Sequence, residues 1–198
     1  MDDMEPTVIA TPKKGVPKII FALLGLVLAA EIVFVVKTFS KPTPGPLPKA
    51  KEVSTTAAIT LAVNKREVKV GEKVAVKVIV DTGGRKIAGA DAVLLFDSKV
   101  LEATSGAIVK GSALKDYPFA GIDAKGGIAT VSGISALDGN GISGSFILAT
   151  INFKAKTAGK TVVNVSFTPE STTDSNLVES GTNSDVLEKV EHLSLTIK

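Results

Sequence analysis

From Ala57 onward, the sequence alternates apolar and polar residues with a period of two. The alternation is clear in residues 59–63, 74–80, 163–167 and 193–197. This period places neighbouring side chains on opposite faces of an extended strand. Turn-forming clusters separate the runs: Gly83-Gly84, Gly126-Gly127, Gly139-Asn140-Gly141 and Gly181-Thr182-Asn183. We therefore expect an all-β domain over residues 57–198, with about nine strands in a jelly-roll β-sandwich of two antiparallel sheets.

An apolar run lies near the N-terminus. Residues 19–36 contain a single charged side chain, that of Glu31. A helix of about 20 apolar residues crosses the hydrocarbon core of a bilayer. We expect a single transmembrane helix over residues 16–39, preceded by a short tail, residues 1–15. The alternative is a cleaved signal peptide, which Ala29-Ala30 would suit, but the apolar pattern continues past this pair.

The segment after the apolar run is rich in proline. Residues 40–56 carry a proline at every second position from Pro42 to Pro48. Proline fixes φ and has no amide proton, so this linker should be extended and hold the domain up to ~50 Å from the membrane. A short tail before the span and a whole domain after it is the usual layout of a signal anchor. We therefore expect a single-pass protein of the cell membrane with an extracellular domain.

Composition excludes several classes of function. From Thr55 to Lys198 there are 16 Lys and Arg against 15 Asp and Glu, so the domain is nearly neutral and we expect no nucleic-acid partner. Cysteine is absent from the sequence, which excludes disulfides, thiolate metal ligands and cysteine nucleophiles. His192 is the one histidine, and no nucleophile elbow surrounds a serine, so we do not expect an enzyme.

Four segments share the motifs of a known family. They are VKVGEKVAVKVIVD (68–81), KIAGADAVLLFDSKVLEA (86–103), GSFILATINFKAKTAGKTVVNV (144–165) and SNLVESG (175–181). The second segment reads as a long strand, an Asp-led turn at Asp97-Ser98 and a return to the core at Val100-Leu101. Together the segments resemble the cohesin family, over roughly residues 57–198. The resemblance implies a β-sandwich without catalytic activity that binds a dockerin-like module of another protein through one face.

The resemblance also implies partner-binding residues. Asp91 lies where cohesins often keep an aspartate that hydrogen-bonds the partner helix, and Gly89 replaces what is often an asparagine. Leu177 and Glu179 match another edge of that face. The segment 119–127 departs from the family pattern, which argues against a standard dockerin as the partner.

Polysaccharide binding is the alternative function, because carbohydrate-binding modules have related folds. Flat polysaccharides are usually bound by rows of exposed aromatic rings. The sequence has no Trp and one Tyr, so Tyr117 is the candidate glycan-binding residue, with a core position as the competing interpretation. A third interpretation is a structural subunit of the cell surface that associates with itself.

We expect no cofactor and no metal site, although two segments offer oxygen ligands for Ca²⁺. Residues 137–144 contain Asp138 and Asn140, but the next ligand position is Ile142, so we expect a hairpin turn. Residues 168–176 contain Glu170 and Asp174 beside hydroxyl groups. Ca²⁺ binding at this second segment is the alternative.

Overall fold

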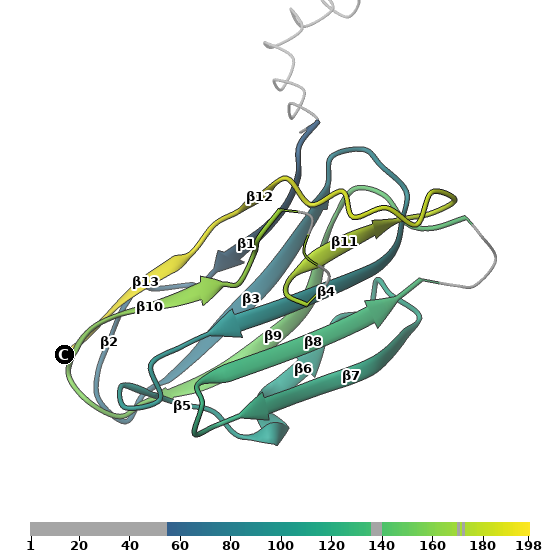
Figure 1. The fold of residues 1–198 in the computed structure, drawn as a ribbon. Helices are drawn as coiled ribbons and strands as arrows, with labels where there is room; N and C mark the ends of the chain where they lie inside the picture. The colour runs from purple at the N-terminus through teal and green to yellow at the C-terminus, as the bar shows by residue number, and fades with distance from the viewer. Residues whose placement is uncertain (1–54, 136–139, 170, 172) are drawn as a thin grey trace, which may run out of the picture. The chain divides into compact units, whose positions relative to one another are not determined.

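A computed structural model describes residues 55–135, 140–169, 171 and 173–198. These residues form two β-sheets (Figure 1), together with one short 3-10 turn, η1 (Ser105–Ala107). The expectation of an all-β sandwich is confirmed. The predicted tail, the predicted transmembrane helix and all but the last two residues of the linker lie outside the described residues. Within the described ranges, no helix is long and apolar enough to cross a membrane.

Both sheets are built mainly from antiparallel pairs. The six-stranded sheet has the order β12-β1-β3-β9-β5, and β6 also pairs with β9. Its strands are β1 (Ala57–Ala62), β3 (Lys73–Thr82), β5 (Leu101–Glu102), β6 (Ile108–Lys110), β9 (Ser145–Ala155) and β12 (Lys189–Val190). The seven-stranded sheet has the order β2-β13-β10-β4-β8-β7, and β11 also pairs with β4. Its strands are β2 (Glu67–Val68), β4 (Ile87–Leu95), β7 (Asp116–Asp123), β8 (Ile128–Ile134), β10 (Gly159–Val165), β11 (Asn176–Glu179) and β13 (Leu193–Ile197).

The alternation in the sequence becomes the division between core and surface. In β3 the side chains of Val74, Val76, Val78 and Val80 are buried, and the residues between them face outward. Burial of one such side chain stabilises the fold by about 1.5–3 kcal/mol. The rings of Phe96 and Phe153 meet edge to face in this core, with centroids 5.0 Å apart.

The chain changes sheet directly after β4. Oδ1 of Asp97 accepts a hydrogen bond from the Lys99 N–H at 2.8 Å. The main-chain oxygen of Asp97 accepts from the N–H groups of Val100 and Leu101, at 3.0 and 2.8 Å. Leu101 is fully buried and begins β5 in the six-stranded sheet. The Asp-led turn therefore ends β4 at Leu95 and carries the chain across the sandwich.

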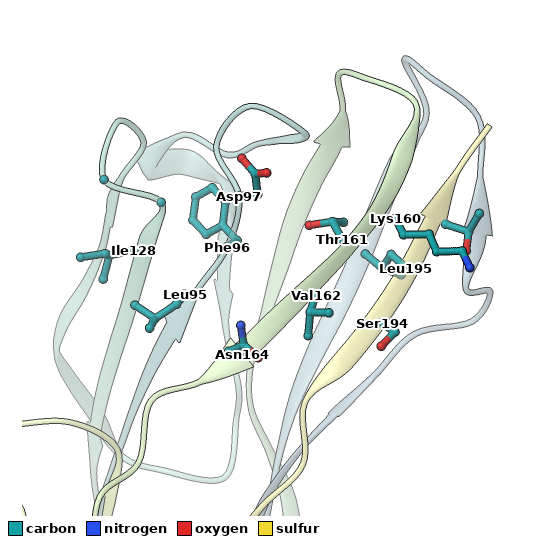
Figure 2. Close-up of a pocket in the computed structure, with 13 residues that line it drawn as sticks. Leu95, Phe96, Asp97, Ile128, Lys160, Thr161, Val162, Asn164, Ser194 and Leu195 are labelled. Carbon is teal, nitrogen blue, oxygen red and sulfur yellow. The ribbon is translucent and has the colours of Figure 1, made fainter.

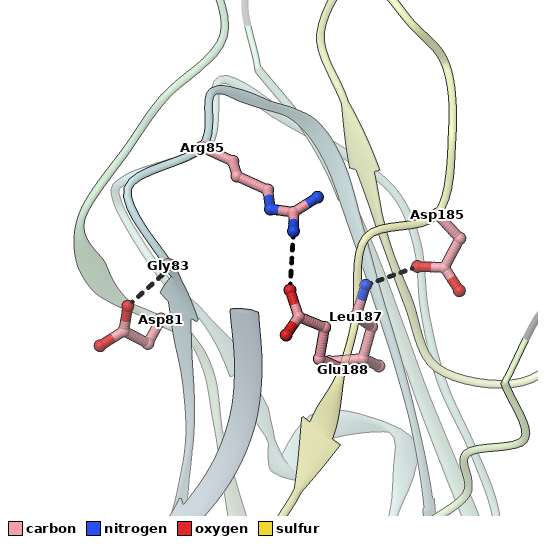
Figure 3. A network of polar contacts seen from close by, with 6 residues as sticks. All are labelled: Asp81, Gly83, Arg85, Asp185, Leu187 and Glu188. Atoms are coloured by element: carbon pink, nitrogen blue, oxygen red, sulfur yellow. Dashed lines mark hydrogen bonds and ion pairs between the residues drawn. The ribbon is translucent and has the colours of Figure 1, made fainter. Parts of the chain in front are cut away.

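A polar network accompanies the crossing near the C-terminus (Figure 3). Oδ1 of Asp185 accepts hydrogen bonds from the N–H groups of Leu177 and Leu187, both at 3.0 Å. Nearby, Nη2 of Arg85 lies 2.7 Å from Oε1 of Glu188. Because both side chains of this ion pair are partly exposed, it contributes at most about 1 kcal/mol. The residues that follow pair with β1 as β12, and the chain then joins the seven-stranded sheet as β13.

The described residues contain thirteen strands, where the sequence predicted about nine. Four of the thirteen, β2, β5, β6 and β12, have two or three residues. A period of two cannot be recognised in so few residues, whereas the nine longer strands agree with the predicted number. The jelly-roll connectivity stays a prediction.

Two glycines in left-handed conformations give a test of the β4–β8 packing. Gly127 has a φ of +68°, and a Cβ there would collide with the carbonyl oxygen of Phe96. Gly84 has a φ of +81°, and nothing lies within 4 Å of its Cβ position. Gly84→Ala should therefore lower the free energy of unfolding only by the cost of a left-handed backbone at a residue with a side chain, about 1–2 kcal/mol.

Gly127→Ala has the same cost of a left-handed backbone, and its new Cβ must also displace the main chain of Phe96. We expect it to lower the free energy of unfolding by more than about 3 kcal/mol, with Gly84→Ala as the matched control. Urea denaturation of both variants measures the difference. Equal losses would contradict the close approach of Gly127 to Phe96.

Candidate partner-binding face

The outer surfaces of β11, β4, β8 and β7 form one continuous face, which we call the β4 face (Figure 1). The strand registers align Asn176 with Asp91, Asp91 with Ser132, and Ser132 with Phe119. Side chains directly opposite each other across paired strands share one surface of a sheet. These side chains form a row across the β4 face, in which Asn176 is buried and Asp91, Ser132 and Phe119 are accessible.

Asp91 projects outward between two buried neighbours, Ala90 and Ala92. It is partly exposed, and within the described part of the chain its carboxylate has neither a hydrogen bond nor an ion pair. An ionised carboxylate has about four acceptor sites. No described residue donates to these sites on Asp91, so they can accept from water or from donors of another molecule.

A hollow of about 400 Å³ lies beside Asp91. Gly89, Ile134 and Val178 contribute to its lining, from β4, β8 and β11 respectively. Gly89 keeps this space open because it has no side chain. A Cβ at Gly89 would lie 3.6 Å from the Gly133 carbonyl oxygen, which is an ordinary contact. The hollow can therefore receive a side chain, either from a partner or from a larger residue at position 89.

The two predicted residues of β11 differ in position. Leu177 is fully buried opposite Ala90, so it supports the β4 face from beneath, where the sequence analysis placed it on the surface. Glu179 follows a β-bulge and is partly exposed at the edge of the face. Its Oε2 accepts a hydrogen bond from the Thr182 hydroxyl at 2.8 Å, so this carboxylate also holds the turn after β11.

Tyr117 is a core residue, which agrees with the competing interpretation of this residue as part of the core. It is 8% exposed. The ammonium group of Lys110 lies 5.7 Å from the centre of its ring and covers it. A buried ring cannot stack on a sugar.

Phe119 is the aromatic side chain that the sequence analysis missed. It is 54% exposed. A β-bulge between Asp116 and Phe119 interrupts the alternation, so the period of two did not show which ring of the segment faces outward. The Phe119 ring lies over Gly121, where a Cβ would be 2.9 Å from its Cζ. The ring therefore lies along the β4 face and adds apolar area to it.

Catalytic and metal-binding groups do not gather on the described residues. No group of three or more His, Cys, Asp or Glu side chains there could hold a metal ion. Asp138 and Glu170, the predicted calcium candidates, lie outside the described residues. Asp174 keeps one buried oxygen, Oδ1, without a hydrogen bond to any described residue. Nδ1 of His192 accepts a hydrogen bond from the Val165 N–H at 3.1 Å, a structural role between β10 and β13.

The model of the cohesin domain family matches residues 59–190, about two thirds of the chain. The chain belongs to the cohesin domain family. Cohesins are non-catalytic binding modules, so this cohesin is a binding module and not an enzyme. No curated protein sequence matched the chain.

Solved cohesin structures share this fold. The type II cohesin domain from the cellulosome of Acetivibrio cellulolyticus has a TM-score of 0.58 at 16% identity, over 71% of this chain and 95% of that one. The non-cellulosomal cohesin of the archaeon Archaeoglobus fulgidus has a TM-score of 0.54 at 16% identity, over 72% and 91%. The third ScaC cohesin of A. cellulolyticus, solved with the ScaB dockerin, has a TM-score of 0.58 at 16% identity, over 72% and 99%. At these identities the likeness shows the fold.

The buried position of Tyr117 has a consequence at alkaline pH. Burial raises the pKa of the Tyr117 phenol above its ordinary value of 10.0. The folded state therefore disfavours the phenolate more than the unfolded state does. The contribution of this group to stability is complete below pH 10 and is lost as the pH rises through the raised pKa.

Tyr117→Phe should remove this alkaline loss of stability. Since Tyr117 is the one tyrosine of the chain, an ultraviolet absorbance titration follows it alone. A folded-state midpoint at the ordinary value would contradict its burial.

Proposed function

We propose that this cohesin binds a helix of a dockerin-like protein through the β4 face, with the carboxylate of Asp91 accepting hydrogen bonds from that helix. The observation that supports this most is the position of Asp91, an outward carboxylate of β4 that has no hydrogen bond or ion pair with any described residue. The class of partner is supported by the ScaC cohesin, which was solved with a dockerin mutated in its C-terminal helix.

The β4 face offers what an amphipathic helix requires. The hollow, which Gly89 and Asp91 both line, accepts an apolar or small side chain. The exposed ring of Phe119 supplies apolar contact at the β7 end of the row. The Asp91 carboxylate accepts from Lys, Arg, Ser or Asn side chains of the helix. Such a central charged acceptor surrounded by apolar contacts is typical of an interface hot spot.

Membrane display is the second part of the proposal. We infer that residues 16–39 anchor the chain in the cell membrane and that residues 40–56 hold the cohesin on the extracellular side. The apolar run with its single charge and the four alternate prolines support this arrangement. Protease digestion of intact cells tests it. Cleavage of the domain with retention of an N-terminal fragment in the membrane is expected, and complete protection of the domain would contradict it.

Polysaccharide binding is the weaker candidate. It now depends on one exposed ring, that of Phe119, since Tyr117 is buried. One ring provides little of the flat aromatic surface that polysaccharides use. Retention of the protein on insoluble polysaccharide, with loss of retention in Phe119→Ala, would be needed to support it.

Charge reversal at Asp91 tests the proposed site. Asp91→Arg should weaken binding to a dockerin by at least about 30-fold, or about 2 kcal/mol, because it removes the acceptor and places a cation against the donors of the helix. Isothermal titration calorimetry with dockerins from the same organism, recognised by their paired calcium loops, measures the effect.

The matched control is Glu102→Arg. Glu102 is an exposed carboxylate of β5 in the six-stranded sheet, so the same charge change is made away from the β4 face. We expect unchanged affinity in this variant and unchanged thermal unfolding in both. Equal weakening by the two reversals would show a general charge effect and contradict a site at Asp91.

Gly89→Asn tests the role of the hollow by filling it with a larger side chain. The position has room for a Cβ, so we expect the variant to unfold within about 0.5 kcal/mol of the wild type. The new side chain occupies the space that a side chain of the partner helix would enter. Affinity for a dockerin should therefore fall several-fold. Unchanged or tighter binding would contradict the entry of a partner side chain into the hollow.

A further inference from the structure

A groove separate from the hollow at Asp91 divides the outer surface of the seven-stranded sheet. Its volume is about 880 Å³. Figure 2 shows Leu95 and Ile128 on one side and Val162 with Ser194 on the other. We call it the β10 groove, because β10 forms one of its walls.

The groove exists because β4 leaves the sheet early. Only two residues of β10, Asn164 and Val165, pair with β4, opposite Leu95 and Leu94. Beyond Leu95 the chain turns toward the six-stranded sheet. The preceding residues of β10, 159–163, pair with β13 on one edge, and no described strand pairs with their other edge.

The pattern of hydrogen bonds shows which main-chain groups point into the groove. The Ser166 N–H donates to the Val93 oxygen of β4, whereas the Val165 N–H donates to His192 on the β13 side. Main-chain groups alternate direction along a strand. Those of Lys160 and Val162 therefore point away from β13.

The hydrogen bonds of β13 to Arg66 lead to the same direction for the main-chain groups of Lys160. The Thr196 N–H donates to the Arg66 oxygen at 2.8 Å, so the main chain of Thr196 faces away from β10. Thr196 lies opposite Lys160, and this pair is therefore of the non-hydrogen-bonded kind. Two N–H donors and two C=O acceptors of β10 thus line the groove with no partner in the described residues.

Side chains around this free edge are apolar inside and basic at the rim. Leu95, Ile128 and Val162 are 40%, 36% and 40% exposed. Lys160 lies in the wall of the groove. Lys99 and Lys125 belong to the turns beside it, and the Lys156 ammonium donates to the Ser98 oxygen of one of these turns. These four residues are the lysine rim. The two nearby aspartates, Asp97 and Asp123, accept hydrogen bonds from main-chain N–H groups of their own turns. No ion pair within the described ranges involves Lys160.

We propose that the β10 groove binds an extended segment of a partner protein as an added strand, antiparallel to β10, in the place that β4 leaves after Leu95. The segment carries apolar residues at alternate positions, which contact the apolar walls, and acidic residues that face the lysine rim. Addition of a peptide strand to a free sheet edge is an established mode of recognition, in which the main chain provides affinity and alternate side chains provide specificity.

A second copy of this chain does not suit the groove. Two β10 edges paired across a twofold axis would bring two lysine rims together, and like charges at that separation repel. An acidic, apolar peptide satisfies both the charge and the free main-chain groups. The site is distinct from the hollow at Asp91, so its occupation does not depend on the proposed dockerin-binding function.

Selection from a display library of short random linear peptides on the full chain tests the proposal. Enriched peptides should alternate Val or Ile with other residues and carry Asp or Glu. Val162→Pro removes the N–H that points into the groove and leaves the β13 ladder intact, and should weaken these peptides at least about tenfold. Val162→Ile keeps the N–H and the apolar contact and should bind as the wild type does. Lys160→Glu should also weaken binding, with Lys77→Glu on the other sheet as its control.

Hydrogen exchange on the wild-type protein provides a second test that does not depend on whether Val162→Pro folds. The amides of Lys160 and Val162 should exchange rapidly in the free protein and slowly with a selected peptide bound. Failure to enrich any acidic, apolar sequence would overturn the proposal. Peptides that bind wild type and both Val162 variants equally would also overturn it. If the wild-type chain dimerises and Val162→Pro abolishes the dimer, the groove binds a second copy of the chain. That result would overturn the proposal of a peptide partner.

Discussion

The pairing of β4 on both edges is the constraint on which the rest of the structure depends. One edge pairs with β8 along seven residue pairs, and the other is shared between β11 and β10. Pairing on both edges fixes which side chains of β4 face outward, since a shift of one residue would bury Asp91 and expose Leu94. The β4 face and the β10 groove are both consequences of this arrangement.

The two surfaces differ in the physics of recognition that they offer. The β4 face presents side chains on a fully hydrogen-bonded sheet, which suits a preformed helix that brings its own donors. The β10 groove presents unpaired main-chain groups, which suit an extended segment that has no structure of its own before binding. Together, the two proposals give this cohesin separate surfaces for a folded module and for a flexible segment. Display on a proline-rich stalk, as we propose, would leave both surfaces accessible.

The period of two in the sequence was sufficient to predict the sandwich and its longer strands, because alternate burial of side chains requires apolar and polar residues to alternate along each strand. Asp91 was singled out by the resemblance to cohesins, and the structure places it as an outward residue of β4. The period of two could not predict two features of the structure. The bulge before Phe119 shifts the alternation, so the pattern did not show that Phe119 is the exposed ring of this segment and Tyr117 the buried one. The burial of Leu177 depends on its pairing with Ala90, a contact between segments far apart in the sequence. The β10 groove, likewise, follows from the place where β4 separates from β10.

Site-specific photo-crosslinking can show which face of this cohesin a bound dockerin touches. A photoreactive amino acid in place of Ser132 lies beside Asp91 on the β4 face, and one in place of Lys77 lies on the outer side of the six-stranded sheet. The account predicts a covalent cohesin–dockerin product from position 132 and none from position 77. A product from position 77 alone would contradict the assignment of the β4 face as the partner-binding surface.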